Sequence, residues 1–169
     1  MINKKHLSNS EVKEINEQIK NLYKIENAIE KKDVAILEED IIRINNKSSF
    51  FYYNIDNTKN NNTNNIIKII IPTLRNILES KIWYETLKKV TVDMGAVKFV
   101  VSGADVMRPG IVAFDDEINK DDIILVVDVN HKKPLAVGIM QFAREEAKAM
   151  SSGKIVKNVH WVGDKVWNS

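Results

Sequence analysis

The distribution of glycine is the feature that most constrains what this sequence can form. All 6 glycines lie between residues 95 and 163, and the first 94 residues contain none. Glycine adopts tight turns and left-handed backbone at no steric cost. The second half of the chain is therefore predicted to be a compact, turn-rich β structure. The change in character near Lys88 predicts two domains, residues 1–88 and residues 89–169, without a flexible linker because a strand follows at once.

The first half is predicted to combine one helix with a small antiparallel sheet. Ser8 and Glu11 form a capping-box pattern, and apolar residues follow at helical spacing. From Asp33 the apolar period shifts toward two, which predicts strands. Pro72 is expected in the first turn of a later helix, where its missing N–H costs nothing. The expected strands are Val34–Ile36, Ile42–Ile44, Phe50–Ile55 and Ile66–Ile71, with a solvated hairpin tip at 57–65.

The second half is predicted to alternate short strands with two short helices. Asp93 is placed to cap a helix near residues 95–102, and Gly103 is placed to end it. A second helix is expected at 143–150. The expected strands lie near 90–93, 109–114, 123–129, 134–142, 154–160 and 164–167. This density of short strands predicts a small barrel.

Composition excludes several kinds of protein and site. The sequence has no cysteine, so disulfides, thiolate zinc sites and cysteine nucleophiles are excluded, and a cytoplasmic location is expected. No apolar run approaches the roughly 20 residues that cross a bilayer, so no membrane partner is expected. Residues 1–89 hold 15 basic and 12 acidic side chains, and residues 90–169 hold 10 and 11, a net charge of −1. Nucleic-acid binding by the second half must therefore rest on a local basic patch.

Short motifs in the second half occur in the order of a known domain. They are Val92–Val97, Gly103–Ile111, Pro134–Gly138, the Gly153-Lys154 turn with Val156, and Gly163–Trp167. Over about residues 90–167 they resemble the PUA domain, which is named after pseudouridine synthases and archaeosine transglycosylases. Residues 71–74, Ile-Pro-Thr-Leu, are similar to the pre-PUA domain of translation-associated PUA proteins. These include the malignant-T-cell-amplified-sequence proteins, the amino-terminal part of ligatin and stand-alone archaeal relatives.

The resemblance implies an α+β protein, in which an α/β pre-PUA domain with a small antiparallel sheet precedes a PUA β pseudo-barrel. It implies non-catalytic binding of structured RNA, either the acceptor end of a tRNA or ribosomal RNA, in translation initiation or recycling at the ribosome. The small ribosomal subunit or a translation-factor protein would be a further partner. Two alternatives stay open: an accessory factor in ribosome assembly or in rRNA or tRNA modification, and a protein-interaction adaptor that does not bind RNA.

The candidate RNA-binding residues surround the turn between Gly103 and Gly110. Glycine allows a sugar-phosphate chain to approach closely, and Arg108 offers a forked donor to a phosphate. Lys98 is expected to point outward near the same loop, and the carboxy-terminal lysines are expected to complete a basic face. The full candidate set is Lys98, Gly103, Ala104, Asp105, Arg108, Pro109, Gly110, Lys154 and Lys165.

The other polar clusters are interpreted as structural. The carboxylates of Asp115–Glu117 and Asp121–Asp122 fit a solvated turn better than a cation site. The histidines have no partner motif, and the sequence has no phosphate loop, nucleophile elbow or recognisable carboxylate pair. We therefore expect no catalytic residue, metal or cofactor, and no enzymatic activity. The histidines are His6, His131 and His160, and the residues assigned to core packing are Met107, Trp161, Trp167 and Phe50–Tyr53.

Overall fold

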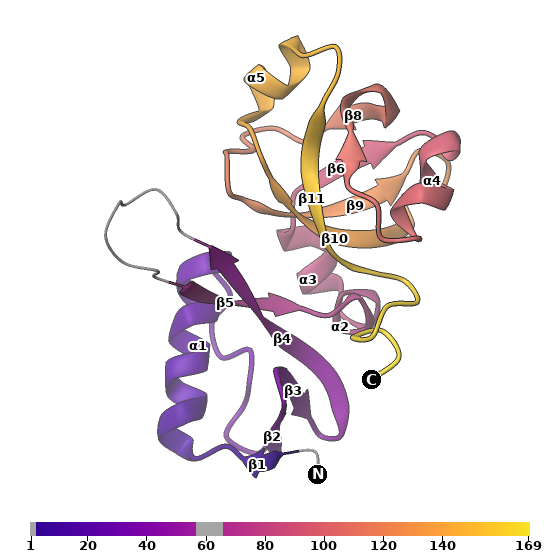
Figure 1. Cartoon of the computed structure of the whole chain (residues 1–169). Helices are drawn as coiled ribbons and strands as arrows, with labels where there is room; N and C mark the ends of the chain where they lie inside the picture. Colours follow the sequence, from indigo (N-terminus) through magenta and orange to yellow (C-terminus); the bar gives the residue numbers. More distant parts are fainter. Residues whose placement is uncertain (1–2, 57–65) are drawn as a thin grey trace. The chain divides into compact units, whose positions relative to one another are not determined.

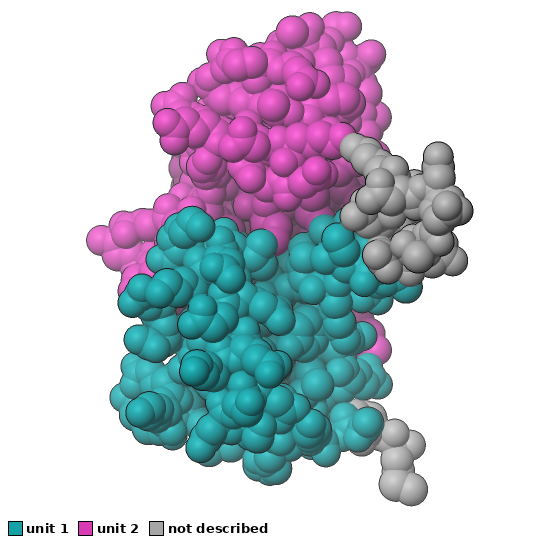
Figure 2. All heavy atoms as spheres, turned by 90° about the vertical axis from the view of Figure 1, so that its left-hand side faces the viewer, with its two compact units in different colours: residues 1–72 teal, residues 73–169 magenta. Residues whose placement is uncertain are grey.

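The computed structural model describes residues 3–56 and 66–169. The chain divides into two compact units, which meet in the sequence between Pro72 and Thr73 and are coloured separately in Figure 2. The domain boundary expected after residue 88 stays a prediction. The hairpin tip expected at 57–65 lies outside the described residues.

Unit 1 is an antiparallel five-stranded sheet with a helix alongside it (Figure 1), in the strand order β1-β2-β3-β4-β5. The Glu11 carboxylate accepts the backbone N–H of Ser8 at 2.9 Å and the Ser8 hydroxyl accepts the N–H of Glu11, so the predicted capping box begins the helix. The Tyr23 hydroxyl donates to the carbonyl oxygen of Ile70 at 2.7 Å and ties the helix end to the sheet. The elements are β1 Lys4–His6, α1 Asn9–Tyr23, β2 Ala35–Glu38, β3 Ile41–Ile44, β4 Lys47–Asp56 and β5 Ile66–Pro72.

Pro72 is the last residue of β5, so its expected place in a helix is wrong. It lies opposite Phe50 in the sheet. Thr73 instead caps α2 (Leu74–Glu79), since its hydroxyl oxygen accepts the N–H of Asn76 at 3.1 Å. The threonine hydroxyl accepts a hydrogen bond from a backbone N–H in the first turn, whereas a proline side chain has no acceptor atom. The end of a strand tolerates a residue that has no N–H of its own.

Unit 2 is built on a six-stranded mixed sheet that curves into a nearly closed barrel (Figure 1), in the order β7-β11-β10-β9-β6-β8. Neighbouring strands are antiparallel, except that β6 runs parallel to β9. The 3-10 turn η1 links the two edge strands β7 and β8. The elements after α2 are α3 Lys81–Thr86, β6 Lys89–Val92, α4 Met94–Val100, β7 Val106–Met107, η1 Arg108–Gly110, β8 Ile111–Phe114, β9 Ile123–Asp128, β10 Pro134–Met140, α5 Arg144–Ala149 and β11 Lys154–Trp161.

The barrel interior is filled by branched and aliphatic side chains, and Trp161 packs against them as predicted. A Cβ at Gly138 would lie 2.3 Å from Cγ1 of Val156, so only glycine lets β10 and β11 approach this closely. The predicted α+β class with a carboxy-terminal pseudo-barrel is confirmed. Phe50 and Phe51 of unit 1 are buried, as expected. Among the described residues, no helix is long and apolar enough to cross a membrane.

The strand predicted at 164–167 is wrong, because these residues form turns. The Asp164 carboxylate accepts the N–H of Trp161 at 3.1 Å and that of Trp167 at 2.7 Å, which curls the chain back on itself. Trp167 therefore lies on this turn rather than in the barrel core. There the guanidinium carbon of Arg75 sits 4.9 Å from the centroid of its ring.

The edge strand β7 also differs from expectation. Side chains alternate along a strand, and Val106 takes the inward position. Met107 is consequently 49% exposed rather than part of the core. The strand expected from residue 109 begins at Ile111, because the proline and glycine before it form the 3-10 turn.

Candidate nucleic-acid interface

Helix α4 presents a cation and an aromatic ring side by side. The Asp93 carboxylate caps the helix by accepting the N–H of Ala96 at 2.8 Å. The helix buries Val100 and leaves Lys98 and Phe99 at the surface, where Phe99 is 56% exposed. The Lys98 ammonium lies 5.0 Å from the centroid of the Phe99 ring. An exposed ring beside an ammonium can stack a nucleobase while the cation faces a phosphate.

The loop after α4 is held against β11 at Gly103. Its φ is +91°, and a Cβ there would lie 2.6 Å from the ring of Trp161. The N–H of Gly103 donates to the carbonyl of Val100 at 3.0 Å, and that of Ala104 donates to the carbonyl of Phe99 at 3.0 Å. The backbone of the loop is therefore fixed before any ligand arrives.

The side chains of Asp105 and Asn158 lock the same loop onto the middle of β11. Asp105 accepts the N–H of Asn158 at 2.9 Å, and Asn158 donates to the carbonyls of Val100 and Ala104 at 3.0 Å each. The second oxygen of Asp105 lies 3.2 Å from the ammonium of Lys154, whose side chain is about half exposed. The charge of Asp105 is thus matched within the protein, and Lys154 stands at the surface beside the loop.

Arg108 stabilises the 3-10 turn η1, the crossover between the edge strands β7 and β8. Its guanidinium donates to the carbonyl of Ile111 at 3.1 Å and to that of Lys148 at 3.4 Å, and lies 5.7 Å from the ring centroid of Phe114. Its backbone N–H donates to Gly153. Among the described residues its Nε finds no partner. A forked contact with phosphate would compete with these carbonyls, and the role expected of Arg108 stays a prediction.

Of the last two predicted positions, Pro109 is exposed and Gly110 lies against α4. A Cβ at Gly110 would lie 2.9 Å from Cβ of Ala96, and the carbonyl of Gly110 accepts the N–H of Asp93 at 2.9 Å. Lys165 stands exposed on the turn after β11. The structure therefore places the predicted residues at four positions: α4 with its loop, the 3-10 turn η1, the start of β11 at Lys154, and the carboxy-terminal turn.

The two ends of the barrel differ in charge. At the end where α4 begins, the carboxylates of Asp128 and Asp164 are turned inward and nearly buried. Burial raises the pKa of Asp164, but donors from His160, Trp167 and Trp161 outweigh this and lower it.

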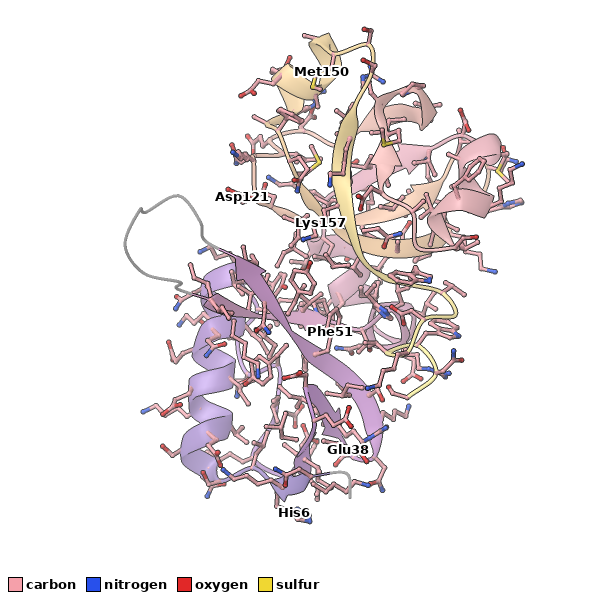
Figure 3. The ribbon with its side chains drawn as sticks, in the orientation of Figure 1. His6, Glu38, Phe51, Asp121, Met150 and Lys157 are labelled. Carbon is pink, nitrogen blue, oxygen red and sulfur yellow. The ribbon has the colours of Figure 1, made fainter. Side chains whose placement is uncertain are left out.

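The acidic turns lie at the other end of the sheet. At the end of β10, the backbone N–H of Met140 donates to the backbone carbonyl of Asp122, and the carbonyl of Met140 accepts the backbone N–H of Asp121. Figure 3 shows Asp121 on the side of unit 2 opposite α4. The exposed carboxylates of these turns therefore lie away from α4, whereas the carboxylates near the start of α4 are nearly buried.

Sequence reasoning missed three residues that build this site. Phe99 is one of four apolar residues on α4, at 96, 97, 99 and 100, and a seven-residue helix cannot bury all of them. Asn158 and His160 are buried polar residues within β11. Polar side chains at the inward positions of a buried strand are the signal that could have revealed them.

The comparisons with known proteins agree with this architecture. Residues 88–162 match the family model of the PUA domain. A crystal structure of a hypothetical protein from Pyrococcus horikoshii has a TM-score of 0.74 at 32% identity, and the match covers 98% of each chain. The chain belongs to the PUA-domain proteins.

Some proteins that are similar to this chain are named for a role in translation. It is 50% identical over 99 residues to an uncharacterized protein of Methanocaldococcus jannaschii, covering 59% of each chain. It is 35% identical over 104 residues to translation machinery-associated protein 20 of Schizosaccharomyces pombe, covering 59% of this chain and 56% of that one. The chain thus matches a little over half the length of these relatives. The predicted resemblance to the translation-associated group is confirmed, since malignant T-cell-amplified sequence proteins are also similar.

Proposed function

We propose that this chain binds structured RNA and acts in translation without catalysing a reaction. The observation that carries the proposal is the surface of α4 and its loop, where Lys98 and Phe99 stand on a fixed backbone and the ammonium of Lys154, from β11, reaches Asp105 of the loop. The neighbouring carboxylates are paired or buried. Cations on a rigid frame hold phosphates, and the exposed ring accepts an unpaired base. The translation-related name of the yeast relative supports the same role.

The target that fits this surface is an RNA with both a helical stem and unpaired nucleotides. The acceptor end of a tRNA and a ribosomal RNA helix both have this form. The surface offers few side chains that could read base edges, so recognition rests on shape and on phosphate positions. The step would be initiation or recycling at the ribosome, with the small subunit or a translation factor as the second partner.

The direct test is a titration of deacylated bulk tRNA with the purified chain, followed by fluorescence anisotropy at 50 mM and 200 mM salt. We expect binding that weakens with salt, and a clear loss of affinity in the double variant Lys98→Gln/Lys154→Gln. Lys120→Gln, at the acidic end of the barrel, is the matched control and should bind as the wild type does. No binding of tRNA or of a ribosomal RNA stem at 50 mM salt would overturn the proposal.

The place of the protein in translation is tested separately in cell extracts. Sedimentation should place the chain with mature small ribosomal subunits. Sedimentation with precursor particles instead would favour the accessory role in ribosome assembly. Retention of a protein partner by a chain that binds no RNA would favour the adaptor role.

A further inference from the structure

The turn between β9 and β10 is a rigid, exposed and basic element that the candidate site does not include. Residues 129–133 have the sequence Val-Asn-His-Lys-Lys and are all exposed. The Asp128 carboxylate accepts the N–H groups of Asn130, His131 and Lys133 at 2.9, 2.7 and 2.9 Å. Because this carboxylate is nearly buried, the turn is fixed from inside and its side chains project from a defined backbone.

Two of these side chains are lysines with ammonium groups available to an anion. Lys132 donates to the hydroxyl of Thr91 at 3.2 Å, and an ammonium has three N–H donors, so two remain. The backbone carbonyl of Lys132 accepts a hydrogen bond from the Tyr84 hydroxyl at 3.0 Å, so α3 also holds the turn in place. Lys133 is exposed. The nearest acid on α3, Glu85, is paired with Lys81 at 3.4 Å.

The turn lies at the same end of the barrel as the loop after α4. Ala136 at the start of β10 lies opposite Trp161 of β11, and the ring of Trp161 packs on Gly103. The N–H of Val162 donates to the carbonyl of Leu135 at 3.1 Å, next to the turn. In the sheet, β11 lies between β10, which follows the turn, and β7, which follows the loop.

We propose that the β9–β10 turn is a second phosphate-binding element, and that Lys132 and Lys133 hold the sugar-phosphate backbone of the RNA bound at α4. This inference rests on the proposed function and deepens it. The RNA would be held at two places across one end of the barrel, with the buried carboxylates of Asp128 and Asp164 beneath it. Two separated contacts fix the direction of a stem, which a single patch does not.

The experiment measures the salt dependence of binding with a stem-loop RNA that ends in four unpaired 3′ nucleotides. Each phosphate neutralised contributes roughly 0.7 to 0.9 to the slope of log affinity against log salt. Lys132→Gln/Lys133→Gln should lower the slope by about 1.4 to 1.8 and weaken binding at low salt. Lys120→Gln should change neither quantity. Thermal unfolding should show that all three proteins are folded at the temperature of the titration, since the double variant loses only the contact of Lys132 with Thr91.

The outcomes separate the two proposals. If the wild type binds the stem-loop and the double variant keeps both its slope and its affinity, the β9–β10 turn does not contact RNA and only the further inference fails. If the wild type binds no RNA at 50 mM salt, the proposed function fails and the inference fails with it. A drop in affinity that Lys120→Gln reproduces would show general electrostatic attraction and would overturn the assignment to the turn.

Discussion

His160 and Asp164 form a buried pair at the end of β11. The Nδ1 atom of His160 lies 2.7 Å from the Asp164 carboxylate, while its Nε2 atom accepts the N–H of Leu74 at 3.0 Å. A ring nitrogen that accepts a hydrogen bond has no proton, so the proton lies on Nδ1 and is donated to Asp164. One imidazole thereby joins the first turn of α2 to the turn after β11.

Replacing His160 by leucine is expected to destabilise the protein by about 3 kcal/mol. The substitution leaves the N–H of Leu74 and the carboxylate of Asp164 buried without this partner, and each such loss costs about 1 to 3 kcal/mol. Urea unfolding of the variant measures the change. His131→Leu, at an exposed position, is the control and should stay within about 0.5 kcal/mol. An equal effect of the two substitutions would contradict the role assigned to His160.

The same pair predicts how stability depends on pH. The pKa of Asp164 is lower in the folded chain than its ordinary value of 3.8, although burial raises it, because its donors outweigh burial. The unfolded chain therefore binds the proton first as pH falls. The stabilisation is complete above about pH 4 and is lost at lower pH. Melting temperatures at pH 6, 5, 4 and 3 should fall less steeply for Asp164→Asn than for the wild type. Parallel curves would exclude this contribution.

Gly103 and Gly163 offer a matched pair for the close contact at the loop. Both have a positive φ, +91° and +98°, so alanine is strained at either position. At Gly103 the new methyl group would also meet Trp161, at 2.6 Å, whereas at Gly163 no atom of residues 3–56 or 66–169 lies within 4 Å. We expect Gly163→Ala to cost about 1 kcal/mol and Gly103→Ala clearly more, in urea unfolding. Similar costs would mean that the tryptophan ring moves aside freely.

Phe99→Ala is expected to weaken binding of an RNA with an unpaired 3′ end by about 1 to 3 kcal/mol, because the base loses its stacking partner. Stability should change little, since the ring is largely exposed. Val112→Ala removes another exposed apolar side chain of the barrel and serves as the control. Anisotropy titrations measure the affinity for the stem-loop with its unpaired 3′ end and for the blunt form. The loss of affinity caused by Phe99→Ala should appear only with the unpaired end.

The capping box of α1 predicts an unusually acidic carboxyl group. The ammonium of Lys5 and the N–H and hydroxyl of Ser8 donate to Glu11 and lower its pKa from 4.5 to about 2. A carbon-13 NMR titration of the glutamate carboxyl groups should find this midpoint. Lys5→Ala removes the largest cause and should raise the midpoint toward the ordinary value. A wild-type midpoint near 4.5 would show that the capping contacts do not persist in solution.

Local signals in the sequence were sufficient for most elements. Ser8 with Glu11 marks the start of α1, and Asp93 marks that of α4, because a helix begins where a side chain satisfies its first amides. Gly103 lies in the turn after α4, whose last residue is Val100, and its positive φ makes glycine the expected residue there. These features depend on residues a few positions apart, so the sequence displays them directly.

The contacts that the sequence did not reveal are made by polar side chains, some with local partners and others with partners distant in the sequence. Asp164 curls the terminal residues through contacts within the turn, which an apolar pattern does not reveal. Asn158 reaches back 58 residues to Val100, and the guanidinium of Arg108 reaches 40 residues to Lys148. Whether a polar side chain faces solvent or holds two segments together is decided by packing, and periodicity does not report it.

The pairing of β7 with β11 constrains the order in which unit 2 can assemble. Val106 lies opposite Val156 in the sheet, so this edge forms only after the intervening residues have been synthesised. Until β11 is in place, β10 has only β9 as a neighbour. Its unpaired N–H and carbonyl groups can then form hydrogen bonds with other chains. The barrel can therefore close only after β11 has been synthesised, because β7 pairs with that strand.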